Sequence, residues 1–172
     1  MSLEIVRLDA TAFARAAEPL AELLADAVAG GASVGFLPPF GRVEALAWWR
    51  TLQQDVASGA VVVLAASLEE RIVGTVQLRL AQWPNARHRA EVAKLLVHSS
   101  VRRRGVGRSL MAEIERVARS AARTLLVLDT IADSDAERLY EALGWTRVAS
   151  IPEYAMHDGQ LRPTTIFCRI LR

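Results

Sequence analysis

Residues 92–111, VAKLLVHSSVRRRGVGRSLM, decide the organisation of this 172-residue chain. The apolar residues that open the stretch, at 92–97, are typical of a buried strand. A short turn and an arginine run with two glycines follow. Leu110, Ile114 and Val117 then recur at the spacing of an amphipathic helix. The stretch therefore predicts a strand, a glycine-containing loop and a helix in direct succession.

The loop between this strand and this helix has the character of an anion-binding site. The first N–H groups of a helix have no intrahelical partner, and the helix dipole adds positive potential, so phosphate oxygens are natural ligands there. Gly105 and Gly107 let the backbone approach such a ligand without an intervening Cβ. Taken alone, the loop leaves open an ordinary strand-to-helix turn with solvated arginines.

Composition and charge favour a globular protein with a small phosphorylated ligand. The chain is 52% hydrophobic and 23% charged, with a net charge of +2, and its length fits one domain of residues 1–172. The basic residues gather locally at 87–89 and 102–104, whereas a nucleic-acid groove would require a broad basic face. Cys168 is the only cysteine, and no signal peptide or membrane-spanning run is evident. We therefore expect a cytoplasmic protein that binds neither nucleic acid nor a membrane.

The remaining segments predict an α/β (α+β) fold of about seven strands and about four helices. Strands are expected at 3–8, 61–66, 72–80, 91–97, 125–130, 145–151 and 164–171. Helices are expected from a cap at Asp9 or Thr11 to Gly30, at 42–57, after the arginine loop, and at 134–143.

The arginine loop resembles the acetyl-CoA pyrophosphate loop of the GCN5-related N-acetyltransferase (GNAT) superfamily, whose pattern is Gln/Arg-x-x-Gly-x-Gly/Ala. The matching residues are Arg102, Gly105 and Gly107. A later segment is similar to the superfamily pattern Asn-x-x-Ala-x-x-Leu/Phe-Tyr-x-x-x-Gly-Phe. Its residues are Asp133, Ala136, Leu139, Tyr140, Gly144 and Trp145. Aspartate replaces asparagine at 133, and a carboxylate cannot donate a hydrogen bond as the amide does.

This resemblance implies the GNAT fold, in which two central parallel strands part, with acetyl-CoA as cosubstrate. No metal is expected, because His88, His98 and His157 lack the spacing of metal ligands and the single cysteine adds no cluster. The resemblance also implies a set of residues that bind the cosubstrate, from the strand, the loop and the later motif. These are Leu95, Leu96, Val97, Arg102, Arg103, Arg104, Gly105, Val106, Gly107, Arg108 and Ala136. A backbone N–H near Leu96 or Val97 would meet the oxyanion.

Three residues are candidates for catalysis. Glu91 stands where the histone acetyltransferases of the superfamily carry their catalytic glutamate, and a carboxylate buried near apolar walls could accept a proton. Its alternative role is an ion pair with Arg89. Asp129 could hold the substrate ammonium or share the role of base, or it could cap the following loop. Tyr140 matches the family tyrosine that donates a proton to the CoA sulfur.

Segments outside the CoA motifs resemble one branch of the superfamily, the tabtoxin resistance acetyltransferases. They are residues 30–36, 89–92, 126–130 and 158–164. The resemblance implies N-acetylation of a small primary amine, with tabtoxinine-β-lactam as one candidate. It implies substrate contacts from Ser33, Phe36, Arg89, Glu91 and Asp129. Acetylation of a protein N-terminus or lysine, and CoA sensing without turnover, remain alternatives, as do a monomer and a homodimer.

Overall fold

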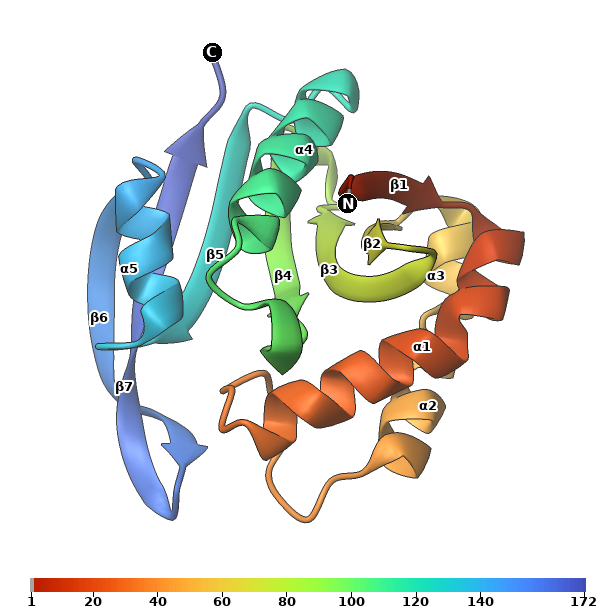
Figure 1. The fold of residues 1–172 in the computed structure, drawn as a ribbon. Coiled ribbons are helices and arrows are strands. Elements are labelled where there is room, and N and C mark those ends of the chain that lie inside the picture. The colour runs from red at the N-terminus through yellow and green to blue at the C-terminus, as the bar shows by residue number, and fades with distance from the viewer. Residues whose placement is uncertain (1) are drawn as a thin grey trace.

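The computed structural model describes residues 2–172. Its strands are β1 Glu4–Leu8, β2 Val61–Leu68, β3 Arg71–Leu80, β4 Arg89–Val97, β5 Leu125–Ile131, β6 Thr146–His157 and β7 Gln160–Ile170. Its α-helices are α1 Ala10–Ala29, α2 Arg42–Thr51, α3 Gln53–Ser58, α4 Val106–Ser120 and α5 Asp135–Ala142, and short 3₁₀ turns lie at Pro84–Ala86 and Ser99–Val101. The strands form one mixed sheet in the order β1-β2-β3-β4-β5-β7-β6, as Figure 1 shows. The predicted α/β class, seven strands and element order are confirmed.

The helices cover both faces of this sheet. One core cluster joins the sheet to α4 through residues such as Leu110 and Ile114, and a second joins it to α1 and α2 through Phe13, Leu24 and Trp49. The expected cap of α1 is Asp9, whose carboxylate accepts a hydrogen bond from the N–H of Ala12 at 2.8 Å.

Two expected elements differ from the structure. The helix expected at 42–57 is divided at Leu52 into α2 and α3. The final two strands are longer than expected, since β6 continues past Pro152 and the hairpin turn lies at 158–159. Proline lacks an N–H for the ladder, but β6 is an edge strand and its register with β7 shifts between Ile151 and Ala155, so the proline is accommodated.

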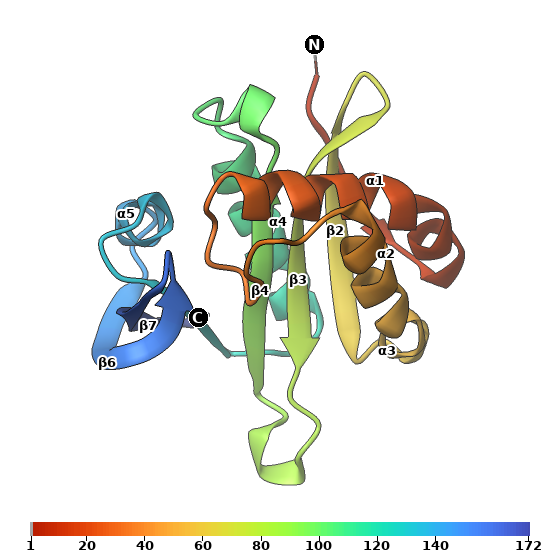
Figure 2. The ribbon, with the colours of Figure 1, turned by 90° about the horizontal axis from the view of Figure 1, so that it is seen from below.

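The central feature of the sheet is the parting of β4 and β5. These parallel strands pair only at Arg89 with Leu125, Ala90 with Leu126 and Glu91 with Val127. Beyond Glu91, β4 continues to Val97 beside β3 alone, while β5 pairs with β7. In Figure 2, β6, β7 and α5 accordingly stand apart from β2, β3 and β4.

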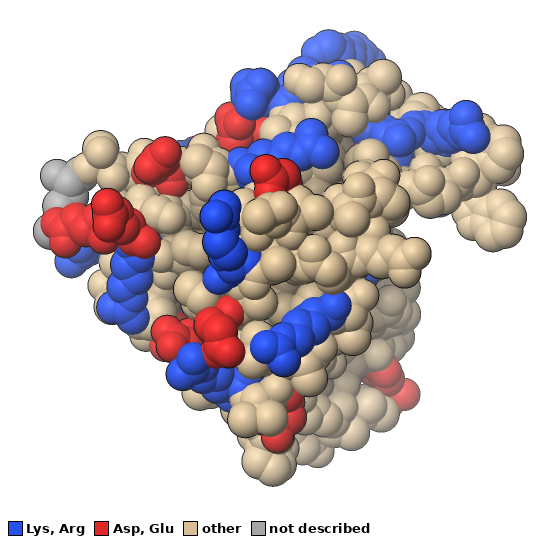
Figure 3. Space-filling model, turned by 90° about the vertical axis from the view of Figure 1, so that its right-hand side faces the viewer, with Lys and Arg blue, Asp and Glu red and all other residues tan. Residues whose placement is uncertain are grey.

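The surface carries charges of both signs. On the face shown in Figure 3, basic and acidic side chains are interspersed. None of the helices in the described residues is long and apolar enough to cross a membrane.

Candidate active site

A bulge in β4 lies where β5 has departed. Gln77 pairs with Ala93 and Thr75 pairs with Leu96, so two residues of β4, Lys94 and Leu95, stand opposite one residue of β3. Lys94 adopts a φ of 51°, in the left-handed region. A bulge of this kind redirects side chains and frees backbone groups from the ladder. The residues expected to meet the thioester and the oxyanion, at 95–97, therefore lie on a distorted strand with no partner on its β5 side.

The start of α4 has the geometry of an anion site. Gly105 is the N-terminal cap with a φ of +85°, a conformation that favours glycine, and no side chain caps the helix. The first intrahelical bond runs from the N–H of Ser109 to the carbonyl of Gly105 at 3.0 Å, so the N–H groups of Val106, Gly107 and Arg108 have no helical acceptor. These groups are available to phosphate oxygens.

The two sequence motifs meet at Gly107. A Cβ built on Gly107 would lie 3.4 Å from Leu139 of α5 and 3.7 Å from Val97 of β4. Both distances are ordinary van der Waals contacts, so β4, α4 and α5 meet at Gly107 and an alanine would fit there. Ala136, one turn before Leu139, is partly buried against the α4-side core.

The four predicted arginines are all exposed, but they do not act alike. Arg102 folds back, so that its Nε donates to the carbonyl of Val97 at 3.2 Å and its guanidinium lies against Gly30. Arg103 lies 3.9 Å from Asp135. The side chains of Arg104 and Arg108 form no hydrogen bond or ion pair among residues 2–172. Arg102 thus joins the loop to the end of α1, while the others remain open to solvent.

Asp26 of α1 fixes the turn that precedes this loop. Its carboxylate accepts hydrogen bonds from the N–H of Ser99 at 2.8 Å and from its hydroxyl at 2.7 Å. Burial would raise the pKa of Asp26, but the bonds from Ser99, with His98 and Arg102 nearby, lower it overall. Asp26 was not among the residues predicted from sequence.

Glu91 and Asp129 lie on one face of the sheet, on either side of the point where the strands part. Glu91 pairs with Val127, and Asp129 follows two residues later, so all three side chains share that face. Both acidic residues are exposed, and the expected burial of Glu91 is therefore wrong. Within residues 2–172 no ion pair joins Glu91 to Arg89, which lies at the closed end of the junction. In the pairing of β3 with β4, Glu91 stands opposite Arg79 of β3.

Tyr140 of α5 is buried in the core cluster on the α4 side of the sheet. Its ring lies 6.1 Å from that of Trp145 and 5.9 Å from that of Phe167, and it is 6% exposed. Burial raises the pKa of the Tyr140 hydroxyl, and the Asp129 carboxylate raises it further. The hydroxyl is therefore protonated at neutral pH, and the same two effects make it a weaker acid than an ordinary tyrosine.

The loop between α1 and α2 brings aromatic side chains to the same face as Glu91. Phe36 stacks on Phe40 with centroids 4.4 Å apart and meets Trp48 edge-on at 5.3 Å. Phe36 and Ser33, both predicted to contact substrate, are partly buried. The neighbouring tryptophans differ, because Trp49 is fully buried whereas Trp48 remains partly accessible.

Sequence reasoning missed Lys94. Its Nζ lies 5.6 Å from the centre of the Phe36 ring and 5.2 Å from that of Trp48. Burial lowers the pKa of Lys94, and Arg79 lowers it further, while Asp129 and Glu91 act in the opposite direction. A signal was present in the sequence, since Lys94 is the only lysine among 21 basic residues and the only charge within the apolar run 92–97.

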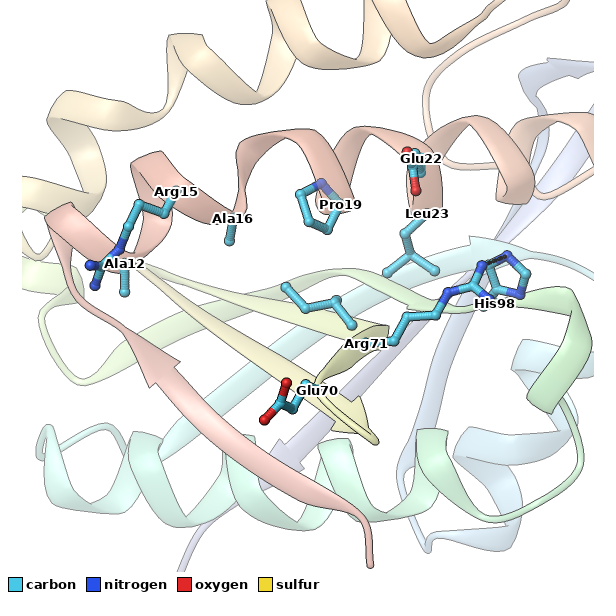
Figure 4. A pocket seen from close by; sticks show the side chains of 10 residues that line it. Ala12, Arg15, Ala16, Pro19, Glu22, Leu23, Glu70, Arg71 and His98 are labelled. Carbon is cyan, nitrogen blue, oxygen red and sulfur yellow. Dashed lines mark hydrogen bonds between the residues drawn. The ribbon is translucent and has the colours of Figure 1, made fainter. Parts of the chain in front are cut away.

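One cavity of the protein lies away from this site. Its volume is about 360 Å³. It lies between α1 and the β2–β3 hairpin, and Figure 4 shows Arg15, Arg71 and His98 among its lining residues. None of the predicted catalytic residues lines it. No group of three or more His, Cys, Asp or Glu side chains in residues 2–172 is arranged to hold a metal ion.

Solved structures share this fold. The structure of yncA from Salmonella typhimurium, solved with its cofactor acetyl-CoA, is 20% identical to this chain and has a TM-score of 0.79. The match covers 100% of this chain and 95% of the yncA chain. An N-acetyltransferase from Staphylococcus aureus Mu50 is 15% identical over 100% of both chains, with a TM-score of 0.82. A ribosomal-protein-alanine N-acetyltransferase from Brucella melitensis is 20% identical over 98% of this chain and 99% of its own, with a TM-score of 0.77.

The sequence itself matches a family model. The match to the acetyltransferase (GNAT) family covers residues 22–145, which include the β4 bulge, the glycine loop and both central strands. Because it spans more than half of the chain, the protein belongs to the GNAT family of acetyltransferases.

Proposed function

We propose that residues 1–172 form one N-acetyltransferase domain that transfers the acetyl group of acetyl-CoA to the primary amine of a small molecule. The observation that carries this proposal is the parting of β4 and β5 immediately after Glu91 and Val127. Along one side of this opening, the β4 backbone has no strand partner, and at one end lies the uncapped start of α4. The carboxylates of Glu91 and Asp129 lie on the face of the sheet away from α4. These features suit the chemistry of acetyl-CoA, which carries amides and phosphates. The pantetheine amides would lie along residues 94–97 and the phosphates on the N–H groups of residues 106–108.

The proposed roles follow from these positions. Acetyl-CoA supplies the thioester carbonyl that the amine attacks. Glu91 or Asp129 removes the proton from the ammonium, directly or through water, and exposure of both carboxylates makes a water-mediated route accessible. A backbone N–H near Leu96 or Val97 stabilises the negative charge on the carbonyl oxygen. Tyr140, protonated in its buried position, gives a proton to the departing sulfur.

We infer direct transfer from a ternary complex, with no acyl-enzyme. The face that carries Glu91 and Asp129 would bind the amine while acetyl-CoA fills the opening from the α4 side. Positioning of two reactants in this way supplies much of the acceleration in such a reaction.

We further propose an amino-acid-like toxin as acceptor, with tabtoxinine-β-lactam as the leading candidate. The resemblance of residues 30–36 and 158–164 to the tabtoxin resistance branch supports this choice. The partly buried aromatic loop at Phe36 and Phe40 would suit a small ligand better than a peptide. A cytoplasmic location agrees with the free thiol of Cys168.

The test is release of CoA thiol from acetyl-CoA in the presence of single acceptors. The panel comprises tabtoxinine-β-lactam, amino acids, polyamines, aminoglycosides and peptides with free N-termini. Selective turnover of the toxin supports the whole proposal. Turnover of a peptide alone would replace the small-molecule acceptor, and tight acetyl-CoA binding without any turnover would contradict the enzymatic role in favour of a sensor.

A further inference from the structure

The ammonium of Lys94 is partly buried, and no carboxylate in residues 2–172 forms an ion pair with it, although Asp129 and Glu91 favour its charged form from a distance. Its Nζ lies against the faces of Phe36 and Trp48, and a Cβ on Gly35 would lie only 3.7 Å from it. Among residues 2–172, no hydrogen bond or ion pair to Nζ is found. Aromatic faces stabilise a cation only in part, and a desolvated charge without a counter-ion is costly. The arrangement therefore favours an anion that arrives from outside the chain.

Arg79 adds a second cation on the same face of the sheet. It stands opposite Glu91 in the β3–β4 register, and its charge opposes protonation of Lys94. No ion pair joins the Arg79 guanidinium to Glu91 within the described residues. The guanidinium donates from Nε to the side-chain oxygen of Gln77 at 3.3 Å. Lys94 and Arg79 thus place two positive charges beside the β4 bulge.

Gln77 provides a third polar group, whose Nε2 donor has no acceptor in residues 2–172. It is fully buried, its cross-strand neighbour is Ala93, and its Nε2 has no hydrogen-bond acceptor in the described part of the chain. Buried amide donors are almost always paired, so an unpaired one calls for an explanation. Its side-chain oxygen is already used by Arg79, which leaves Nε2 as the free donor.

We propose that Lys94, with Arg79 and Gln77, forms a subsite for the carboxylate of the acceptor, so that the preferred substrate is an α-amino acid or a close analogue. This inference rests on the proposed function. The amine of the same molecule faces Glu91 and Asp129, which lie on the same side of the sheet. Opposite charges of the substrate are thereby matched by two cations and two carboxylates around one opening. In this arrangement the side chain of the substrate would contact the ring cluster of Phe36, Phe40 and Trp48.

The single lysine makes this subsite directly observable without activity. Protein grown with ¹³C,¹⁵N-lysine gives one lysine side-chain signal, because Lys94 is the only lysine in the chain. The CoA-saturated protein is titrated with unlabelled ligands in matched pairs, each an amino acid and the corresponding amine without the carboxylate. The pairs are L-tyrosine and tyramine, L-histidine and histamine, and L-lysine and cadaverine. At least one amino acid is expected to shift the Lys94 signal and to raise its pKa, while the matched amine leaves both unchanged.

Variants assign the effect to charge. Lys94→Met is expected to weaken binding of that amino acid about 10- to 100-fold, the range for a charge-assisted hydrogen bond, and to raise KM with little change in kcat. Lys94→Arg, which keeps the charge, is expected to recover most of the affinity. Arg79→Gln is an independent variant expected to weaken binding as well. Unchanged affinity for CoA shows that each variant is folded.

Three results would overturn the subsite: equal binding of an amino acid and its matched amine, unchanged amino-acid affinity in Lys94→Met, or no response of the Lys94 signal to any amino acid in the panel. Failure of this inference is distinct from failure of the proposed function. Acetylation of amines that lack a carboxylate removes the subsite but keeps the enzyme. Amino acids that bind at Lys94 without acetyl transfer keep the subsite and remove the proposed activity.

Discussion

At the scale of single residues, the proposed chemistry depends on where β4, β5 and α5 place three kinds of group. Glu91 and Asp129 are exposed carboxylates on one face, Tyr140 is a buried acid, and Lys94 is an enclosed cation. Superfamily resemblance and motif spacing predicted Glu91 and Tyr140 as candidates, and the end of a predicted strand predicted Asp129. Lys94 could not be predicted in the same way, because its position depends on a bulge and on aromatic side chains from a distant loop.

The role of Glu91 is tested by Glu91→Gln. The amide cannot accept a proton, so we expect kcat to fall by about 100-fold or more, with acetyl-CoA affinity nearly unchanged. Thiol release and calorimetric titration measure the two quantities. Glu141→Gln, an exposed position on α5, is the matched control and should retain full activity. A normal kcat in Glu91→Gln would remove Glu91 from the mechanism and leave Asp129 as the base.

Lys94 also predicts a dependence of stability on pH. Its pKa lies below the ordinary value of 10.5, so between these two values the unfolded chain binds more protons than the folded chain. The protein therefore gains stability as the pH rises through that window. Lys94→Met should be more stable than the parent at neutral pH, and the difference should narrow toward about pH 10.5. Denaturant unfolding across this range measures it, with Arg50→Met as an exposed control. A difference in the free energy of unfolding that does not change with pH, or a Lys94→Met variant less stable than the parent, would contradict a lowered pKa of Lys94.

At the scale of elements, features that depend on residues close together in the sequence are easier to predict than features that depend on distant partners. The cap at Asp9 and the strand of residues 61–66 follow from side chains a few positions apart, and both are present. Three features escaped prediction: the break at Leu52, the continuation of β6 past Pro152, and the hydrogen bonds from Ser99 to Asp26. Each depends on packing or pairing with a partner that is distant in sequence, which local patterns do not encode.

The loop before α4 is tested by Gly105→Ala. The φ of +85° strains any residue with a Cβ by about 1–2 kcal/mol, although no atom lies within 4 Å of that Cβ. Because the N–H groups that follow depend on this conformation, we expect acetyl-CoA affinity to fall about 10-fold. Gly59→Ala is the matched control, with a φ of +76° and equally open surroundings at the end of α3. It should lose similar stability and keep its affinity. Equal affinities in the two variants would exclude the loop from the site.

At the scale of the whole molecule, the seven-stranded mixed sheet and its element order could be predicted from sequence, because two motifs at the correct spacing resemble one superfamily. The position at which the parallel strands separate could not. It is set by the three residue pairs that join β4 to β5, by the β4 bulge and by the pairing of β5 with β7. That position determines which residues are near the expected thioester, and it brings Lys94 beside Glu91 and Asp129.

The central claim is that acetyl transfer takes place in the opening between β4 and β5. The most direct measurement is a crystal structure of the protein with bound CoA. We expect the phosphates to accept hydrogen bonds from the N–H groups of residues 106–108, and the thiol to lie in the opening between residues 94–97 and Tyr140. CoA bound in the cavity beside Arg15, Arg71 and His98, or lying outside the opening, would contradict the account.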